Sequence, residues 1–129
     1  MKPEERIEYV KYRIKTAYKT YDAAKVLFDN GFYNSAINRL YYAAYYAVNA
    51  LLVNNQIFAQ THSGLKNQFS LHFIKTKKIS TKYGRLFSEL FDWRQKGDYG
   101  NMFDFDSETV DDLFEPVKEL INEIEKKLI

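Results

Sequence analysis

The stretch 33-YNSAINRLYYAAYYAVNALLVN-54 predicts a long helix at the centre of the fold. Its apolar residues cover more than one face; they are Ala36, Ile37, Leu40, Ala43, Ala44, Ala47, Val48, Leu51 and Leu52. A helix that is apolar nearly all round is packed among other helices. We expect the four tyrosines of this stretch, at positions 41, 42, 45 and 46, to cover the remaining surface.

One polar-tipped stripe also runs along this helix. It consists of Arg39, Tyr42, Tyr46 and Asn49, with Asn38 beside it. On a central helix, such a stripe is either a hydrogen-bonded buried network or one wall of a site.

Helices are predicted on both sides of the central stretch. Before it, residues 4–30 carry apolar residues at alternating steps of three and four, the seam of long antiparallel packing. Asn30-Gly31 is a good helix end. After it, a helix is predicted over 62–74, with Thr61 as N-cap, and another over 80–96.

The last predicted helix starts near Asp106 or Ser107, both good N-caps. Pro116 lies inside its apolar pattern, so we expect a kink or a split near Phe114–Glu115. No segment shows the alternation of a strand. The predicted fold class is therefore all-α, an up-and-down bundle of about five helices.

Length and composition limit the classes of protein that fit. The 129 residues are enough for one domain, expected to span 1–129. No apolar run approaches the ~20 residues that cross a bilayer, and Met1–Arg6 is unlike a secretory signal. The chain has no cysteine, which excludes disulfides and thiolate metal sites. We expect a cytoplasmic protein with no membrane association.

Charge is small overall but unevenly distributed. The formal net charge of +2 is too low to identify a nucleic-acid binder. Lys66 through Arg85 holds six basic residues and no acidic one, and Asp98 through Asp112 holds six acidic residues and no basic one. Each segment is either a solvated patch or a binding surface, the first for phosphate and the second for a partner.

Arg94 continues the apolar stripe of the helix over 80–96. The step from Tyr83 to Phe87 to Leu90 leads next to Arg94, so this arginine occupies the following position on the buried face. A guanidinium near a core needs a partner or a ligand, because an unpaired buried charge is costly.

Gly97 and Gly100 follow Arg94, and a left-handed glycine commonly ends a helix. Two interpretations of this region remain open. Either an Arg94–Asp98 pair closes the helix end, or Arg94, Asp98 and Tyr99 form an anion site.

The motifs of several enzyme classes are absent from the sequence. There is no glycine-rich phosphate loop, no metal-binding helix spacing and no nucleophile elbow, so we expect neither metal nor cofactor. Polar groups remain that suit a phosphodiester: Arg39, His62, Arg94, Asp98 and Tyr99. An arginine fork matches phosphate oxygens. His62, in a first helical turn, is disfavoured as a cation, so it is either a neutral proton acceptor or simply exposed.

Three motifs, in order, resemble those of small prokaryotic HEPN-domain proteins. Asn38 to Ala43 resembles their S/N-R-x-Y-Y-A signature on a second helix, and Thr61 to Leu65 resembles the motif that opens their third helix. Arg94 to Tyr99 resembles their R-x-x-x-D-Y segment. The resemblance covers nearly the whole chain.

This resemblance implies a helical bundle that forms a homodimer, with the main site at the dimer interface. Many members of the family are metal-independent ribonucleases, and many are toxins paired with a minimal nucleotidyltransferase antitoxin. The residues that would act in catalysis are Arg94, Asp98, Tyr99 and His62. Those that would bind RNA or a nucleotide are Asn38, Arg39 and Tyr42.

The chain departs from the family's active pattern of an arginine followed, after four to six residues, by a histidine. Tyr99 stands in the place of that histidine, and a free tyrosine titrates near ~10, which makes it a poor base at pH 7. Three hypotheses follow: a ribonuclease toxin, a non-catalytic module that binds a nucleotide, RNA or a partner nucleotidyltransferase, and a structural dimer.

Overall fold

Helices account for most of the chain in the computed structural model, which describes residues 1–99 and 103–128, with Tyr99 described by its backbone alone. The elements are α1 (Pro3–Asp29), α2 (Tyr33–Asn54), α3 (His62–Phe69), the π-helical segment η1 (Ser70–Ile74), α4 (Thr81–Tyr99) and α5 (Ser107–Glu125). Within the described residues there is no strand. The predicted all-α class is therefore confirmed.

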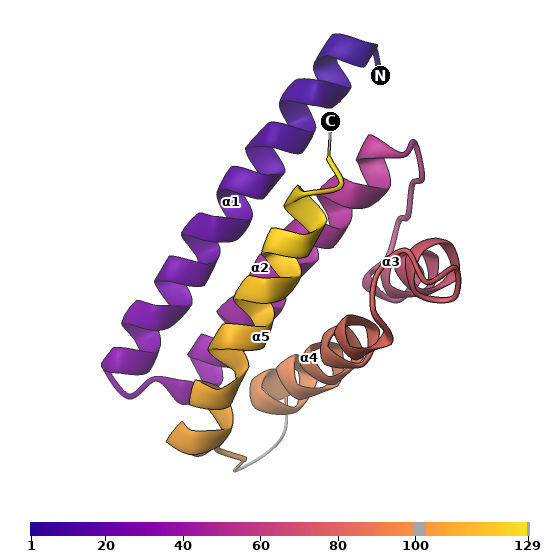
Figure 1. The fold of residues 1–129 in the computed structure, drawn as a ribbon. Helices are drawn as coiled ribbons and strands as arrows, with labels where there is room; N and C mark the ends of the chain where they lie inside the picture. Colours follow the sequence, from indigo (N-terminus) through magenta and orange to yellow (C-terminus); the bar gives the residue numbers. More distant parts are fainter. Residues whose placement is uncertain (100–102, 129) are drawn as a thin grey trace.

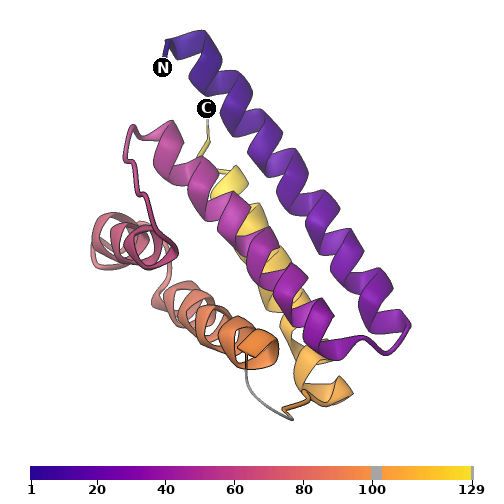
Figure 2. The ribbon, with the colours of Figure 1, turned by 180° about the vertical axis from the view of Figure 1, so that it is seen from behind.

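The second helix, α2, is the central one, as its composition predicts. It contacts each of the other α-helices, and all of its alanines are buried. Figures 1 and 2 show α1, α2 and α5 side by side, while α4 is tilted against them and α3 is seen nearly end-on. Because α3 and α4 both contact α2, side chains on α2 can meet residues from both helices.

Three helix ends follow the capping residues that the sequence predicts. Gly31 adopts a left-handed φ of 81° directly after α1 and its C-cap Asn30. The Thr61 hydroxyl accepts the Gly64 backbone N–H at 2.8 Å, and the Asp106 carboxylate accepts that of Thr109 at 2.8 Å. These caps set where α2 begins and fix the starts of α3 and α5.

The helix predicted over 62–74 has the expected bounds, since α3 and η1 together run from His62 to Ile74. It changes to a wider π-turn at Ser70, where Lys75 N–H reaches Ser70 O at 2.8 Å. Of the two outcomes expected at Pro116, a split of the helix is wrong, because α5 is continuous through the proline. Phe114 and Val117 are buried on either side of the proline, and Tyr21 donates a hydrogen bond to Phe114 O at 3.0 Å, so tertiary packing holds the helix together.

The prediction that Gly97 ends the fourth helix is also wrong, because α4 continues through it to Tyr99. Gly97 instead provides space: a Cβ atom there would lie 3.2 Å from the Phe105 ring. Asn34 holds the same region by donating to Phe103 O at 2.8 Å and accepting from the Phe105 N–H at 2.9 Å. Gly100, the other candidate for the helix end, lies outside the described residues.

No helix among the described residues is long and apolar enough to span a membrane.

Neighbouring alanines of α1 test the packing of α1 on the bundle. Ala24 is 0% exposed, whereas Ala23 is exposed. We predict that Ala24→Leu lowers the free energy of unfolding by about 1–3 kcal/mol, because extra methylenes do not fit a close-packed core. Ala23→Leu is the matched control and should change it by less than about 0.5 kcal/mol. Urea denaturation measures both, and equal effects would contradict this account of α1.

Candidate functional site

The Arg94 side chain is packed on two tyrosine rings of α2. It is 11% exposed, and its guanidinium carbon lies 4.9 Å from the centre of the Tyr41 ring and 5.7 Å from that of Tyr42. Contacts of this kind between a cation and aromatic faces are attractive, and more so when water is removed. The arginine therefore sits on the inward side of α4, as the apolar spacing predicts.

Among the described residues, the Arg94 side chain has an ion-pair partner but no hydrogen bond to its Nε. Its Nη1 lies 3.9 Å from Asp98 Oδ2, which is an ion pair but too long for a hydrogen bond. Its buried Nε has no hydrogen-bond partner among the described residues. Buried polar groups normally have partners, so an unpaired donor next to an ion pair is a feature that a bound anion would satisfy.

Asp98 is held by the polar stripe of α2. Asn38 donates from Nδ2 to Asp98 Oδ2 at 2.9 Å, and Arg39 donates from Nε and Nη2 to Asn38 Oδ1 at 3.1 and 2.9 Å. The Arg39 guanidinium carbon lies 5.0 Å from the centre of the Tyr42 ring. A chain of polar contacts thus connects a second arginine to the carboxylate that faces Arg94.

His62, the first residue of α3, lies against the same tyrosines. Its ring stacks on Tyr45 with centroids 4.6 Å apart and meets Tyr42 edge-on at 5.8 Å. Its Nδ1 is 2.7 Å from the hydroxyl of Tyr41. Burial lowers the pKa of His62 below its usual 6.5, and the charge of Arg94 shifts this pKa in the same direction. The shift favours the neutral imidazole at pH 7, and the neutral form is the one that can accept a proton.

Tyr41 is at the centre of this arrangement. It is 0% exposed, so the expectation that all four tyrosines cover the surface of α2 is wrong for this one. Burial raises the pKa of Tyr41 well above its usual 10, which keeps the phenol protonated. A phenol can donate to Nδ1 or accept from it, so both neutral tautomers of His62 are compatible with the contact.

The fold brings together six of the seven residues predicted for the site: Arg94, Asp98, His62, Asn38, Arg39 and Tyr42. Tyr99 is the last residue of α4, and its side chain lies outside the described residues. Tyr41 and Asn34 also contact this region, but the sequence does not single them out as site residues. The only signal for Tyr41 was its place in the tyrosine-rich motif, and nothing in the sequence indicates the contacts that Asn34 makes.

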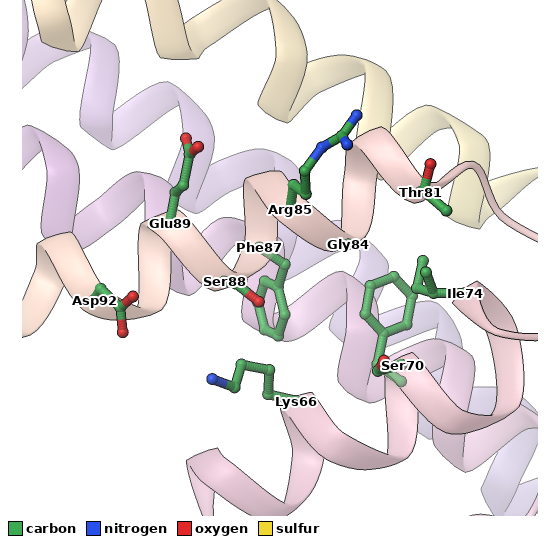
Figure 3. A pocket seen from close by; sticks show the side chains of 11 residues that line it. Lys66, Ser70, Ile74, Thr81, Gly84, Arg85, Phe87, Ser88, Glu89 and Asp92 are labelled. Atoms are coloured by element: carbon green, nitrogen blue, oxygen red, sulfur yellow. The ribbon is translucent and has the colours of Figure 1, made fainter.

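A separate pocket of about 420 Å³ lies between the α3–η1 segment and α4 and contains none of these six side chains. It is lined by Lys66 and Arg85 but also by Glu89 and Asp92, so the surface around this pocket carries charges of both signs. Figure 3 shows Arg85 and Glu89 pointing away from Lys66, on the other side of α4.

Groups of three or more histidine, aspartate or glutamate side chains that could hold a metal ion do not occur in residues 1–99 and 103–128.

The family model described as "HEPN domain" matches residues 10–127. The chain belongs to the HEPN domain family. This match confirms the resemblance that the three motifs indicate.

Relatives of this HEPN domain have been named in bacteria and archaea. A "UPF0332 protein" of Thermotoga maritima is 34% identical over 122 residues, which cover 95% of this chain and 92% of that protein. "Putative toxin MJ0142" of Methanocaldococcus jannaschii is 31% identical over 116 residues, which cover 90% and 79%. "Putative toxin MJ0605" of the same organism is 34% identical over 92 residues, which cover 71% and 69%.

The position of Arg94 on Tyr41 and Tyr42, close to His62, predicts the direction in which the pKa of His62 is shifted. We expect the His62 imidazole to have its midpoint below 6.5 in an NMR titration, because burial and the Arg94 charge both oppose protonation. Removing that charge in Arg94→Gln should raise the midpoint. Arg85→Gln is the control, since Arg85 is an exposed arginine of the same helix. A midpoint above 6.5, or equal shifts in both variants, would contradict this description of the site.

Proposed function

We propose that this HEPN domain is a toxin-like ribonuclease that binds an RNA phosphate at Arg94 and cleaves the adjoining phosphodiester without a metal ion. The observation that carries the proposal is the placement of a guanidinium and a neutral imidazole against the same tyrosine rings, Tyr41 and Tyr42. The names of the two Methanocaldococcus jannaschii relatives support the toxin role.

The chemistry is transfer of a phosphoryl group within the RNA. The ribose 2′-oxygen attacks the adjacent phosphorus, a 2′-O–P bond forms, and the P–O5′ bond breaks. Arg94 stabilises the charge that grows on the phosphate oxygens, because its Nε–H has no hydrogen-bond partner among the described residues and its Nη1 is only loosely paired with Asp98, so both can donate to an anion.

His62 is the candidate for proton transfer. In the tautomer that donates from Nδ1 to the Tyr41 hydroxyl, Nε2 is free to accept the proton of the 2′-OH. The leaving O5′ then takes a proton from the imidazolium or from water. Tyr99 is proposed to hydrogen-bond a phosphate oxygen or the leaving oxygen. In this scheme Asp98 orients Arg94, while Asn38, Arg39 and Tyr42 bind the RNA.

The partners proposed for this chain are a second copy of itself and a minimal nucleotidyltransferase antitoxin. Both proposals rest on the family and on the relatives' names rather than on contacts within the chain. In the homodimer, the Arg94 sites of two copies would face one groove. The arginines of both copies would then act on one RNA strand.

A second candidate function is binding without catalysis. It is favoured by Tyr99 in the position of the motif histidine and by the ion pair that Arg94 already makes with Asp98. In this case the same site would hold a nucleotide, an RNA or the partner transferase, with no bond broken.

RNA cleavage in the presence of a chelator distinguishes the two functions. We predict that the purified protein cleaves single-stranded RNA in EDTA and that Arg94→Ala lowers the rate by about 10²–10³-fold, the usual effect of removing one donor that stabilises transition-state charge. His62→Ala should lower it by at least about 10²-fold. Arg85→Ala is the matched control and should retain the wild-type rate.

Equal cleavage by the wild type and Arg94→Ala would contradict the ribonuclease proposal. Saturable binding of RNA that requires Arg94, with no cleavage by any of these proteins, would support the binding function instead.

A further inference from the structure

A third arginine, Arg13 of α1, is stacked on tyrosines beside the site. Its guanidinium carbon lies 5.2 Å from the centre of the Tyr9 ring and 5.1 Å from that of Tyr46. Arg13 donates from Nε to the Tyr9 hydroxyl at 3.0 Å, and that hydroxyl donates to Asn49 Oδ1 at 2.9 Å. These contacts hold the Arg13 guanidinium over Tyr46 of α2, and the Arg13 side chain remains partly exposed there.

Neither Arg13 nor Arg39 forms an ion pair with a carboxylate within residues 1–99 and 103–128. Among the described residues, the ion pairs are Lys25–Asp29, Arg94–Asp98 and Lys126–Glu123. Within the same residues, the terminal nitrogens of Arg13 make no hydrogen bond. A cation that is oriented by aromatic rings but has no anionic partner is prepared to bind an anion.

These arginines and tyrosines are joined by a chain of contacts, which we call the arginine–tyrosine track. Tyr42 connects the two ends of the track. Its ring contacts the guanidinium groups of Arg39 and Arg94, and the centre of its ring lies 6.0 Å from the centre of the Tyr46 ring. Tyr46 then contacts Arg13. From Arg39 to Tyr46 the axis of α2 rises by about 10 Å. The track consists of Arg94, Arg39, Tyr42, Tyr46, Arg13 and Tyr9.

We propose that the arginine–tyrosine track binds the single strand of RNA that extends from the phosphate at Arg94 toward Arg13. This rests on the proposed function, in which Arg94 takes an RNA phosphate. Single-stranded RNA is recognised by guanidinium planes and aromatic rings on which bases stack, together with cations that follow the backbone.

The charge pattern favours RNA over a protein segment as the occupant. The track carries three arginines with Asp98 as the carboxylate in contact with it, which matches a ligand with a negative charge on each unit. The partly exposed tyrosines between the arginines match a ligand with a planar group on each unit. A nucleic acid strand has both features.

The test compares short and long RNA that cannot be cleaved. Fluorescence anisotropy would measure binding of a dinucleotide and a decanucleotide, both 2′-O-methylated, to the full-length protein at several salt concentrations. We expect the decanucleotide to bind at least about tenfold more tightly. Arg13→Gln should remove most of this gain, leave dinucleotide binding unchanged, and reduce the slope of log K against log salt by about 0.7, the value for one phosphate contact with a single strand.

Lys19→Gln is the matched control, because it removes one positive charge from an exposed position of the same helix. Tyr46→Phe keeps the ring and should bind like the wild type, while Tyr46→Leu should lose affinity for the decanucleotide alone. Circular dichroism would verify that each variant is folded.

The outcomes separate this inference from the proposed function. Decanucleotide binding that is unaffected by Arg13→Gln would overturn the track and leave the Arg94 site intact. No binding of either RNA would overturn both. A change in the molar mass of Arg13→Gln by light scattering, relative to the wild type at the same concentration, would show that this face contacts a second copy, and would also overturn the track.

Discussion

The site depends on a positive charge held against aromatic rings with little access to water. A guanidinium in this position must be stabilised, and the structure supplies two tyrosine faces and one long ion pair to Asp98. That is less than full compensation, because the buried Nε has no partner among the described residues. Removing either the rings or the carboxylate would leave the charge still less stabilised. The other polar residues of the site are arranged around this constraint.

The composition of α2 makes such a site possible within a bundle this small. Small alanines bring neighbouring helices close to one side of α2, while its tyrosines extend from the other side and combine an apolar ring with a polar hydroxyl. Tyr41 illustrates both properties. Its ring stacks on Phe87 in the core, and its hydroxyl reaches His62 on α3. One helix therefore supplies both packing and polar contacts, and residues from α1, α3 and α4 meet on it.

The fold could be predicted from the sequence wherever a local pattern was decisive. The bounds of α2, the left-handed Gly31 and the caps at Thr61 and Asp106 all follow from the composition and spacing of nearby residues. Gly97 could not be assigned in this way, because a glycine that ends a helix and one that admits a neighbouring ring look the same in a sequence. The reason for Gly97 is Phe105, which packs on it from a later segment.

The sequence identifies most of the residues that form the site, but not how their side chains are arranged. The buried spacing of Arg94 and the motif around Asn38-Arg39 identified the residues, whereas the contact between Tyr41 and His62 joins two helices and depends on how α3 crosses α2. The burial of Tyr41 beneath its neighbours depends on the same crossing. Periodicity indicates which face of a helix is buried, but it does not indicate which residue of another helix will lie there.

Arg94 has hydrogen-bonding capacity that a bound anion would use. The ¹⁵N–¹H signal of its Nε–H group, followed during titration with a 2′-O-methylated RNA dinucleotide, reports whether an anion uses it. We expect a saturable shift of this signal, assigned by its loss in Arg94→Gln, at the same dinucleotide concentrations that shift the His62 ring. Binding of the dinucleotide with no shift of the Arg94 Nε–H signal would show that Arg94 is not the anion site.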